Sequence, residues 1–241
     1  MRRVLVLNAN TTPAITDMVT RVLSGDSADI AWRPSTARFG AAYVASEAAY
    51  AIAQHASLDA FAHDGAHCDA VLVACFGDPG LFALREIARV PVVGLADASL
   101  AEASAYGRYA IVTGGVVWKT MLQRFARAVG RADGLVAIRT VAPTGAEIAA
   151  DPHRAITLLA DACKVCVRED GAQAVILGGA GLAGLAERIE SEVSVPVIDS
   201  VLAGGRAIRA ALAAPHGGAA RAAQAPSTGL SRALDDLLLG R

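Results

Sequence analysis

The sequence lacks the features that mark several specialised classes of protein. Four cysteines in 241 residues do not suggest a disulfide framework. Lysine and arginine number 22 and aspartate and glutamate 23, so no excess of charge attracts nucleic acid or an anionic membrane. No apolar run approaches the length of a membrane span, and the one in MRRVLVLNANTT is too short for the core of a signal peptide. We therefore expect a cytoplasmic protein with free thiols and no nucleic-acid or membrane partner.

What the sequence has in quantity is apolar residues arranged in short runs. Hydrophobic residues make up 54% of the chain and charged residues 19%, which indicates a well-buried globular protein. Strand-like runs that are apolar on both faces alternate with helical segments, as in parallel sheets covered by helices. The expected strands are 3–8, 28–33, 70–74, 90–95, 109–113, 136–141, 174–178 and 195–199, and the clearest helices begin at Pro13, Ala41 and Pro152. Pro13 follows Thr12, which is the expected N-cap. The pattern predicts an α/β fold.

An internal repeat divides this pattern into two halves. AVLVACFGDPGL (70–81) aligns without a gap with AVILGGAGLAGL (174–185), and the prolines of two VPV runs are spaced almost equally, at 91 and 196. The repeat predicts two similar α/β halves, residues 1–100 and 101–213, facing each other across a cleft. Residues 214–241 form a loop and a short closing helix. The halves need not be independent domains.

Ligands of parallel α/β sheets bind beyond the carboxyl ends of the strands. The loops placed there are 8–12, 75–80, 113–115 and 178–181, each before a predicted helix, so their amides favour a carboxylate or an enolate oxygen. Cys75 is the cysteine at such a place, where amides would stabilise a thiolate that acts as a nucleophile or in proton transfer. The alternative is a small buried apolar residue at a strand end. In the second half, Gly179 aligns with Cys75.

Two competing interpretations rest on single motifs. GAGLAG (179–184) matches the dinucleotide-binding pattern through Gly179, Gly181 and Gly184, with Asp199 as the ribose-binding acid. Its repeat partner is no such motif, and too few residues follow it to complete a nucleotide-binding sheet. Cys163 and Cys166 share one face of a helix, and HDGAHCD (63–69) lies away from the predicted cleft. No metal site is expected from either.

Three segments together resemble the hydantoin and allantoin racemases of the aspartate/glutamate racemase superfamily. VLNANTT resembles their N-terminal Asn-Pro-Asn-Thr loop, and VACFGDPGLFALREIARVPVVGLADAS resembles their first catalytic-cysteine segment. VILGGAGLAGLAERIESEVSVPVIDSV is similar to their second. The departures are Ala9 for the loop proline, Asp97 for a commoner Glu, and Gly179 for the second cysteine.

The resemblance implies two α/β subdomains related by a pseudo-twofold, with the active site between them and no cofactor. Cys75 matches the first of two cysteines that transfer protons on opposite faces of the substrate. It also implies a homo-oligomer and a hydantoin-like or carboxylate substrate. The residues that would hold the substrate are Asn8, Asn10, Thr11, Phe76, Thr113, Gly114, Gly115, Gly179, Ala180 and Gly181.

The glycine at 179 leaves three functions open. We favour a cofactor-independent racemase or isomerase that uses cysteine-mediated proton transfer at a carbon next to a carbonyl. The second candidate is a decarboxylase of the arylmalonate type, which keeps one cysteine as proton donor. The third is a non-catalytic homologue that binds a small acid.

Overall fold

The structure, a computed structural model, describes residues 1–27, 29–141, 152–215 and 226–240. They form two compact units, each with its own sheet: Met1–Gly94 with Arg206–Arg241, and Leu95–Gly205. The first unit is therefore made from both ends of the chain. The predicted boundaries at 100 and 213 lie six and eight residues beyond those of the units, and residues 216–225 of the predicted tail lie outside the described residues.

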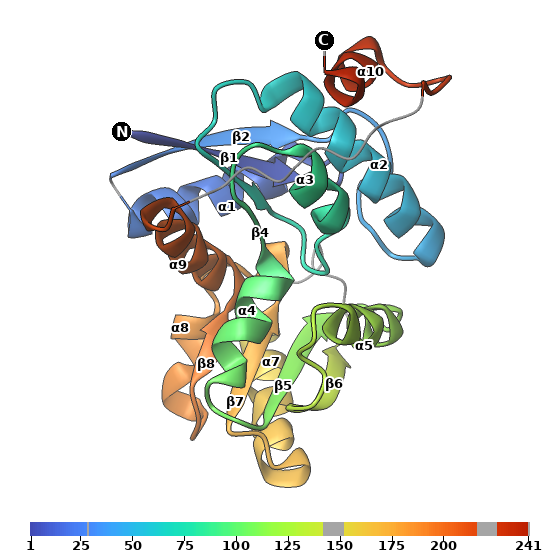
Figure 1. Cartoon of the computed structure of the whole chain (residues 1–241). Helices are drawn as coiled ribbons and strands as arrows, with labels where there is room; N and C mark the ends of the chain where they lie inside the picture. The colour runs from blue at the N-terminus through green and yellow to red at the C-terminus, as the bar shows by residue number, and fades with distance from the viewer. Residues whose placement is uncertain (28, 142–151, 216–225, 241) are drawn as a thin grey trace. The chain divides into compact units, whose positions relative to one another are not determined.

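The first unit is built on a parallel sheet in the order β2-β1-β3-β4. Its strands are β1 (Arg2–Asn8), β2 (Ile30–Thr36), β3 (Ala70–Val73) and β4 (Val92–Gly94). The helices are α1 (Pro13–Asp26), α2 (Glu47–Asp64), α3 (Leu81–Ile87) and the C-terminal α10 (Arg232–Leu239), together with the last part of α9 (Ser200–Ala213). Figure 1 shows α10 lying against α2, two helices far apart in the sequence. Leu234 of α10 is 1% exposed, so this contact belongs to the core of the unit.

The second unit repeats that design with a parallel sheet in the order β6-β5-β7-β8. Its strands are β5 (Tyr109–Gly114), β6 (Leu135–Val141), β7 (Ala174–Gly178) and β8 (Val197–Asp199). The helical segments are α4 (Leu95–Ser104), α5 (Trp118–Ala128), α7 (Pro152–Asp170), η1 (Ala180–Leu182), α8 (Ala186–Ile189), η2 (Glu190–Glu192) and the start of α9. In Figure 1, α4 and α7 cover opposite faces of this sheet. The prediction of an α/β fold with two similar parallel sheets is confirmed.

The repeat extends to single hydrogen bonds. Val71 N donates to Pro91 O (2.9 Å), and in the second unit Val175 N donates to Pro196 O (3.0 Å). Both sheets are thus built in the same register. Since Leu7 pairs with Val73 and Val112 with Leu177, Asn8 and Thr113 hold equivalent positions at the ends of their strands. Cys75 and Gly179 are equivalent in the same sense.

Two helix starts show how side chains set element bounds. Thr12 is the N-cap of α1, as predicted, but its hydroxyl donates to Ala42 O (2.8 Å) and makes no capping bond. The next helix was predicted from Ala41 and begins at Glu47, because Ser46 takes an extended conformation and accepts a hydrogen bond from Ala49 N (3.1 Å). A run of alanines had hidden this capping serine.

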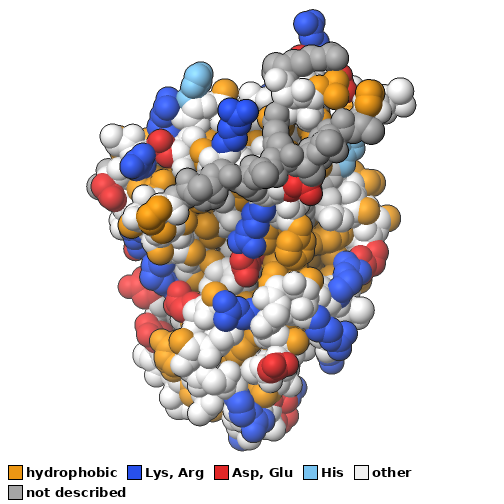
Figure 2. All heavy atoms as spheres, viewed as in Figure 1, with side chains coloured by type: hydrophobic (Ala, Val, Ile, Leu, Met, Phe, Trp, Pro, Cys, Tyr) orange, Lys and Arg blue, Asp and Glu red, His pale blue; other side chains and the backbone are white. Residues whose placement is uncertain are grey.

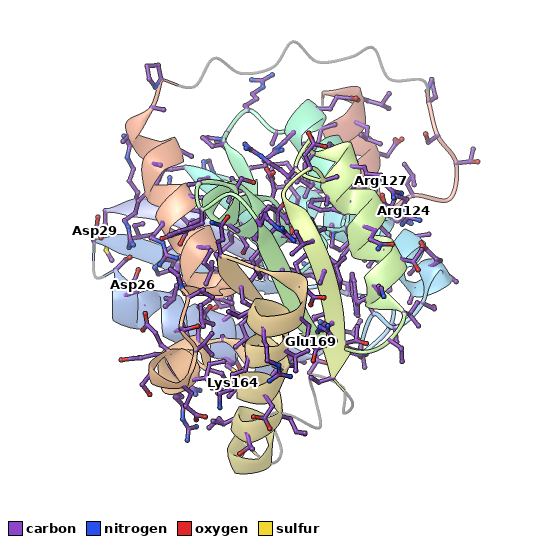
Figure 3. The ribbon with its side chains drawn as sticks, turned by 90° about the horizontal axis from the view of Figure 1, so that it is seen from below. Asp26, Asp29, Arg124, Arg127, Lys164 and Glu169 are labelled. Atoms are coloured by element: carbon purple, nitrogen blue, oxygen red, sulfur yellow. The ribbon has the colours of Figure 1, made fainter. Side chains whose placement is uncertain are left out.

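The surface carries charges of both signs. On the face drawn in Figure 2, basic and acidic side chains are interspersed, as the formal net charge of −1 leads one to expect. Among the charged side chains that Figure 3 labels, Lys164 and Glu169 lie on α7. Lys164 pairs with Glu192 and Glu169 with Arg139, both at the surface. Within the described part of the chain, no helix is long and apolar enough to cross a membrane.

Candidate functional site

Cys75 lies two residues beyond the end of β3 and is 7% exposed. Burial, and secondarily the charge of Asp78, raise the pKa of its thiol to about 12. This direction is opposite to the stabilised thiolate that the sequence pattern predicts. The reason is positional, because α3 begins only at Leu81 and a tight turn separates it from the sulfur. At neutral pH, Cys75 is a protonated thiol that can give up a proton.

The turn after Cys75 is held from several sides. Asp78 N donates to Cys75 O (2.9 Å), and the Tyr50 hydroxyl on α2 donates to Gly77 O (2.7 Å). Gly80 has a φ of +86°, and a Cβ there would lie 3.0 Å from Ser57 Cβ of α2. Glycine is therefore required at this close approach. The turn is a fixed support for the thiol and for the adjacent amide of Phe76, which is itself 5% exposed.

The loop after β1 lies beside this turn, because β1 and β3 are neighbours and Ala74 N donates to Leu7 O (2.7 Å). Asn8 is fully buried, and its side-chain amide donates to Asn10 Oδ1 and Thr16 Oγ1, each at 3.0 Å. Its carbonyl accepts from Asn10 N (3.2 Å). Asn8 therefore organises the loop with all of its polar side-chain atoms.

Two other residues of this loop have polar groups to offer. Asn10 Oδ1 accepts from Asn8 and from Thr12 N, whereas Asn10 Nδ2 has no partner among the described residues. The Thr11 hydroxyl likewise makes no hydrogen bond within the described part of the chain, while Thr11 N donates to Ala41 O (3.1 Å). An unused amide donor and an unused hydroxyl, in a loop that adjoins the Cys75 turn, suit a carbonyl or carboxylate ligand.

In the second unit, the predicted residues at the end of β5 also include some polar groups that are hydrogen-bonded and some that are not. Thr113 is 4% exposed, and its hydroxyl has no hydrogen-bond partner among the described residues. Gly114 ends the strand, and Gly115 N is used in a bond to Val141 O (3.3 Å). Thr113 is therefore the residue of this loop whose side chain can still hydrogen-bond a ligand.

Gly179 follows β7, the neighbour of β5, and so lies beside Thr113. Its N donates to Ser200 Oγ (3.2 Å), and its φ is +146°. A Cβ built on it would meet Leu182 Cγ at 3.5 Å and Thr113 Oγ1 at 4.0 Å, which are ordinary contacts. The position has room for a side chain, but its backbone conformation is one that suits glycine. The amides of Ala180 and Gly181 open the following 3-10 turn without an acceptor among the described residues.

The dinucleotide interpretation of residues 179–184 is wrong on two counts. The segment opens a three-residue 3-10 turn and a four-residue helix, too short to direct a helix N-terminus at a pyrophosphate. Asp199 is not a ribose ligand either, because its carboxylate accepts from Gly184 N (2.6 Å), Val201 N (2.8 Å) and Leu202 N (3.1 Å). It ties the glycine loop to the start of α9.

Two of the remaining cysteines are packed in the core, and two carboxylates in the His-Asp segment 63–69 make hydrogen bonds within the fold. Cys163 and Cys166 are fully buried in the core between α7 and the sheet, and burial raises their pKa to about 12 and about 11. Asp64 bonds Ser35 and Arg38, and Asp69 bonds the backbone of Arg3. Within the described ranges, no three His, Cys, Asp or Glu side chains gather as a metal site would require.

Sequence reasoning overlooked Asp78 and Ser200, which touch the two equivalent positions 75 and 179. Both are 1% exposed. The signal for Asp78 was available, since an acidic residue between the two glycines of a buried turn is unusual. Ser200 carried no such signal, because it begins a helix and resembles an ordinary helix-terminal serine.

The sequence as a whole matches one family model. The model described as Asp/Glu/Hydantoin racemase matches residues 4–208. A hydantoin racemase from Pseudomonas sp. (strain NS671) is 42% identical over 137 residues, which are 56% of this chain and 55% of that protein. A hydantoin racemase from Paenarthrobacter aurescens is 37% identical over 134 residues, 55% and 57% of the two chains. The chain thus aligns with little more than half the length of these relatives.

Solved structures match over more of the chain. Allantoin racemase from Klebsiella pneumoniae has a TM-score of 0.89 and 26% identity, covering 98% of this chain and 99% of that one. Allantoin racemase from Pseudomonas fluorescens has a TM-score of 0.83 and 28% identity, covering 86% and 89%. Arylmalonate decarboxylase without ligand has a TM-score of 0.61 and 17% identity, covering 98% and 100%, which shows a common fold.

Proposed function

This chain belongs to the Asp/Glu/hydantoin racemase family, and from that premise we propose that it is a cofactor-independent isomerase that moves a proton at a carbon next to a carbonyl. The substrate is a small hydantoin-like, allantoin-like or amino-acid-like molecule. The hydantoin and allantoin racemases to which the chain is similar support this choice.

The observation that carries the proposal is a buried cysteine in a turn that adjoins a loop with unused hydrogen-bond donors. Cys75 is buried with a pKa near 12, and the loop that bears Asn10 and Thr11 adjoins its turn. In the proposed cycle, the thiolate form of Cys75 removes the α-proton and becomes the thiol, while the electron pair of the broken C–H bond passes to the carbonyl oxygen and forms an enolate. Cys75 Sγ–H, whose proton exchanges with solvent, then protonates the α-carbon and becomes the thiolate again. The enolate oxygen is stabilised by donors such as Asn10 Nδ2 and the amides near Phe76.

The substrate contacts predicted in the second unit are proposed on the sequence pattern alone. Thr113, Gly114, Gly115, Gly179, Ala180 and Gly181 would hold the substrate through hydroxyl and amide groups. Residues 179–184 contain no acidic side chain, so the loop equivalent to that of Cys75 supplies no second thiol. We expect solvent water to protonate the face of the carbon opposite Cys75, and racemisation to be slow compared with exchange on the Cys75 face.

A second candidate function, decarboxylation of a malonate, is favoured by the protonation state of Cys75. Cleavage of the bond to the departing carboxylate releases CO₂ and leaves the electron pair on the α-carbon. The thiol then donates one proton to that carbon and is reprotonated by water. No base is needed, which suits a sulfur with a pKa near 12.

Deuterium exchange separates these functions. Single enantiomers of hydantoins, allantoin and amino acids are incubated in D₂O, and α-exchange is followed by NMR together with optical rotation. Exchange faster than loss of rotation, both abolished by Cys75→Ser, is the expected result. Loss of rotation at the rate of exchange would mean a second efficient acid.

Aryl- and alkylmalonates are tested in parallel for CO₂ release and for the handedness of the product. CO₂ release without exchange of any hydantoin would replace the isomerase with the decarboxylase. Binding of substrates with neither reaction would leave a small-acid-binding homologue.

A further inference from the structure

The turn that carries Cys75 has a demanding backbone conformation. Three of its residues have a positive φ: Gly77 (+104°), Asp78 (+52°) and Gly80 (+86°). A residue with a side chain rarely adopts such a φ, and the conformation persists only where the surrounding structure fixes it. The turn lies beyond Val73, the last residue of β3, so contacts other than strand pairing must hold it.

One face of α2 supplies those contacts. Tyr50, Gln54 and Ser57 are spaced four and three residues apart, so they lie on the same face of the helix. The Tyr50 hydroxyl donates to Gly77 O (2.7 Å). A Cβ at Gly80 would lie 3.1 Å from Gln54 O and 3.0 Å from Ser57 Cβ. In Figure 1, α3, which follows the turn, lies beside α2. Tyr50 therefore gives the turn a directional bond, and the other two residues limit its space.

The bond from Tyr50 belongs to a peptide group that is held at both ends. Gly77 O, at one end, accepts from the Tyr50 hydroxyl, and Asp78 N, at the other, donates to Cys75 O (2.9 Å). Because a trans peptide group is planar, its C=O and N–H point in opposite directions. Fixing Gly77 O therefore also fixes the direction in which Asp78 N donates to Cys75 O.

The same geometry extends to the amide of Phe76. Cys75 O and Phe76 N belong to one peptide group, so the Phe76 N–H points in the direction opposite to Asp78 N. Phe76 N donates no hydrogen bond within the described part of the chain. It is one of the amides that the proposed function assigns to the enolate oxygen. Two successive peptide groups thus connect the Tyr50 hydroxyl to this donor.

We propose that Tyr50 is a positioning residue, whose hydroxyl orients the peptide group between Gly77 and Asp78 and thereby the Phe76 amide and the backbone of Cys75. The inference rests on the proposed function for its effect on the reaction. Its effect on the turn rests on the hydrogen bonds alone. Tyr50 needs no contact with the substrate to act in this way.

The test uses Tyr50→Phe, which keeps the ring and removes the hydroxyl. Alkylation of Cys75 by iodoacetamide is measured at a fixed, mildly alkaline pH, with mass spectrometry to separate it from Cys68. We expect it to accelerate roughly three- to tenfold, as the loss of one hydrogen bond changes a local opening equilibrium. For α-exchange in D₂O, we expect kcat to fall roughly tenfold with KM within about twofold, because a misplaced amide weakens its bond to the enolate more than to the substrate.

Two other hydroxyl deletions are the controls. Tyr109→Phe is matched in chemistry, because the Tyr109 hydroxyl also donates to a backbone carbonyl, that of Arg131, but in the second unit. Ser57→Ala is matched in place, because the Ser57 hydroxyl lies on the same face of α2 but donates to Ala53 O of its own helix (2.9 Å). Both should leave the alkylation rate of Cys75 and kcat unchanged, and thermal unfolding measures the stability that each variant loses.

Unchanged alkylation in Tyr50→Phe, or equal acceleration in Tyr109→Phe, would overturn the inference. So would faster alkylation with an unchanged kcat, and so would a rise in KM alone, which would make Tyr50 a substrate contact. If the wild type exchanges no substrate, faster alkylation in Tyr50→Phe but not in the controls would support the inference for the turn and count against the proposed function.

If Tyr50→Phe does not fold by circular dichroism, hydrogen exchange of the wild type decides. The amides of residues 76–81 should then exchange together with those of α2, because the turn opens only when its bond to the helix breaks. Earlier exchange of the turn would overturn the inference.

Discussion

Cys75 and Gly179 are equivalent residues whose backbones differ. Among the described non-glycine residues, positive φ occurs at His67 and Asp78, so Cys75 has an ordinary conformation, while Gly179 has a φ of +146°. The loss of the side chain at 179 thus accompanies a backbone conformation that an L residue rarely adopts. The space for a side chain remains, since a Cβ there makes contacts no closer than 3.5 Å.

We predict that Gly179→Cys increases racemisation relative to one-sided exchange. A thiol would then stand at the position equivalent to Cys75, at a cost in stability of about 1–3 kcal/mol for the strained backbone. Optical rotation and α-exchange of a hydantoin in D₂O measure the first effect, and thermal unfolding measures the second.

Gly179→Ala is the control for this variant, because it introduces the same backbone strain without an acid. It should lose a similar amount of stability and gain no racemisation. Equal rates in the Cys and Ala variants would show that position 179 does not face the reacting carbon.

Among the helices and strands, α7 is one in which the face predicted from the sequence is the face that is buried. The helix runs from Pro152 to Asp170, as predicted, and Cys163 and Cys166 lie on the face that packs into the core. Burial raises the pKa of both thiols. Their role is therefore packing, and their ionisation is coupled to folding.

This coupling predicts alkaline destabilisation. The unfolded thiols have a pKa of 9.0 and the folded ones of about 12 and about 11. The contribution of these two thiols to the free energy of unfolding is fully present below pH 9. It falls as the pH rises from 9 to 12, because the unfolded chain releases protons that the folded chain retains. The slope is at most about 1.4 kcal/mol per pH unit for each thiol.

Urea unfolding at several pH values from 8 to 11 measures this slope. The double variant Cys163→Ala, Cys166→Ala should be less stable at pH 8, because it leaves a gap in the core, but should lose less with rising pH. The same slope in both proteins would mean that other groups, such as Tyr109 with its raised pKa, dominate alkaline unfolding.

The whole molecule consists of two units with separate cores, and the chain passes between them at residues 94–95 and 205–206. The second passage falls inside α9. Arg209, in the part of α9 that belongs to the first unit, pairs with Asp26 at the end of α1 (2.8 Å). The C-terminal residues are therefore needed to complete the unit that the N-terminus begins.

This organisation predicts local responses to core mutations. Leu23→Ala in the first unit and Leu159→Ala in the second both remove a fully buried side chain and should each cost about 2–5 kcal/mol. Hydrogen exchange followed by mass spectrometry should show lost protection mainly in the unit that carries the change. Uniform loss in both units, from either variant, would indicate that they unfold together.

Local sequence patterns were enough to predict the order of elements, the parallel sheets and the repeat, because apolar runs, Pro13 and aligned glycines act within short stretches of chain. They also located Cys75 and Gly179 at equivalent strand ends. Tertiary structure decided the chemistry of those positions. The Asn8 side chain makes its hydrogen bonds within its own loop, and burial raises the pKa of the Cys75 thiol.

The same holds for the two carboxylates. Asp78 and Asp199 do not align with each other in the repeat. The pairing of β3 with β4 and of β7 with β8 shows that each carboxylate nevertheless lies between a loop and the end of a neighbouring strand, Asp78 against Gly94 and Asp199 against Gly184. The physical reason is that burial and hydrogen bonding depend on residues brought together from distant parts of the chain. A local pattern specifies a strand and its end, whereas the protonation of a side chain there depends on its neighbours in space.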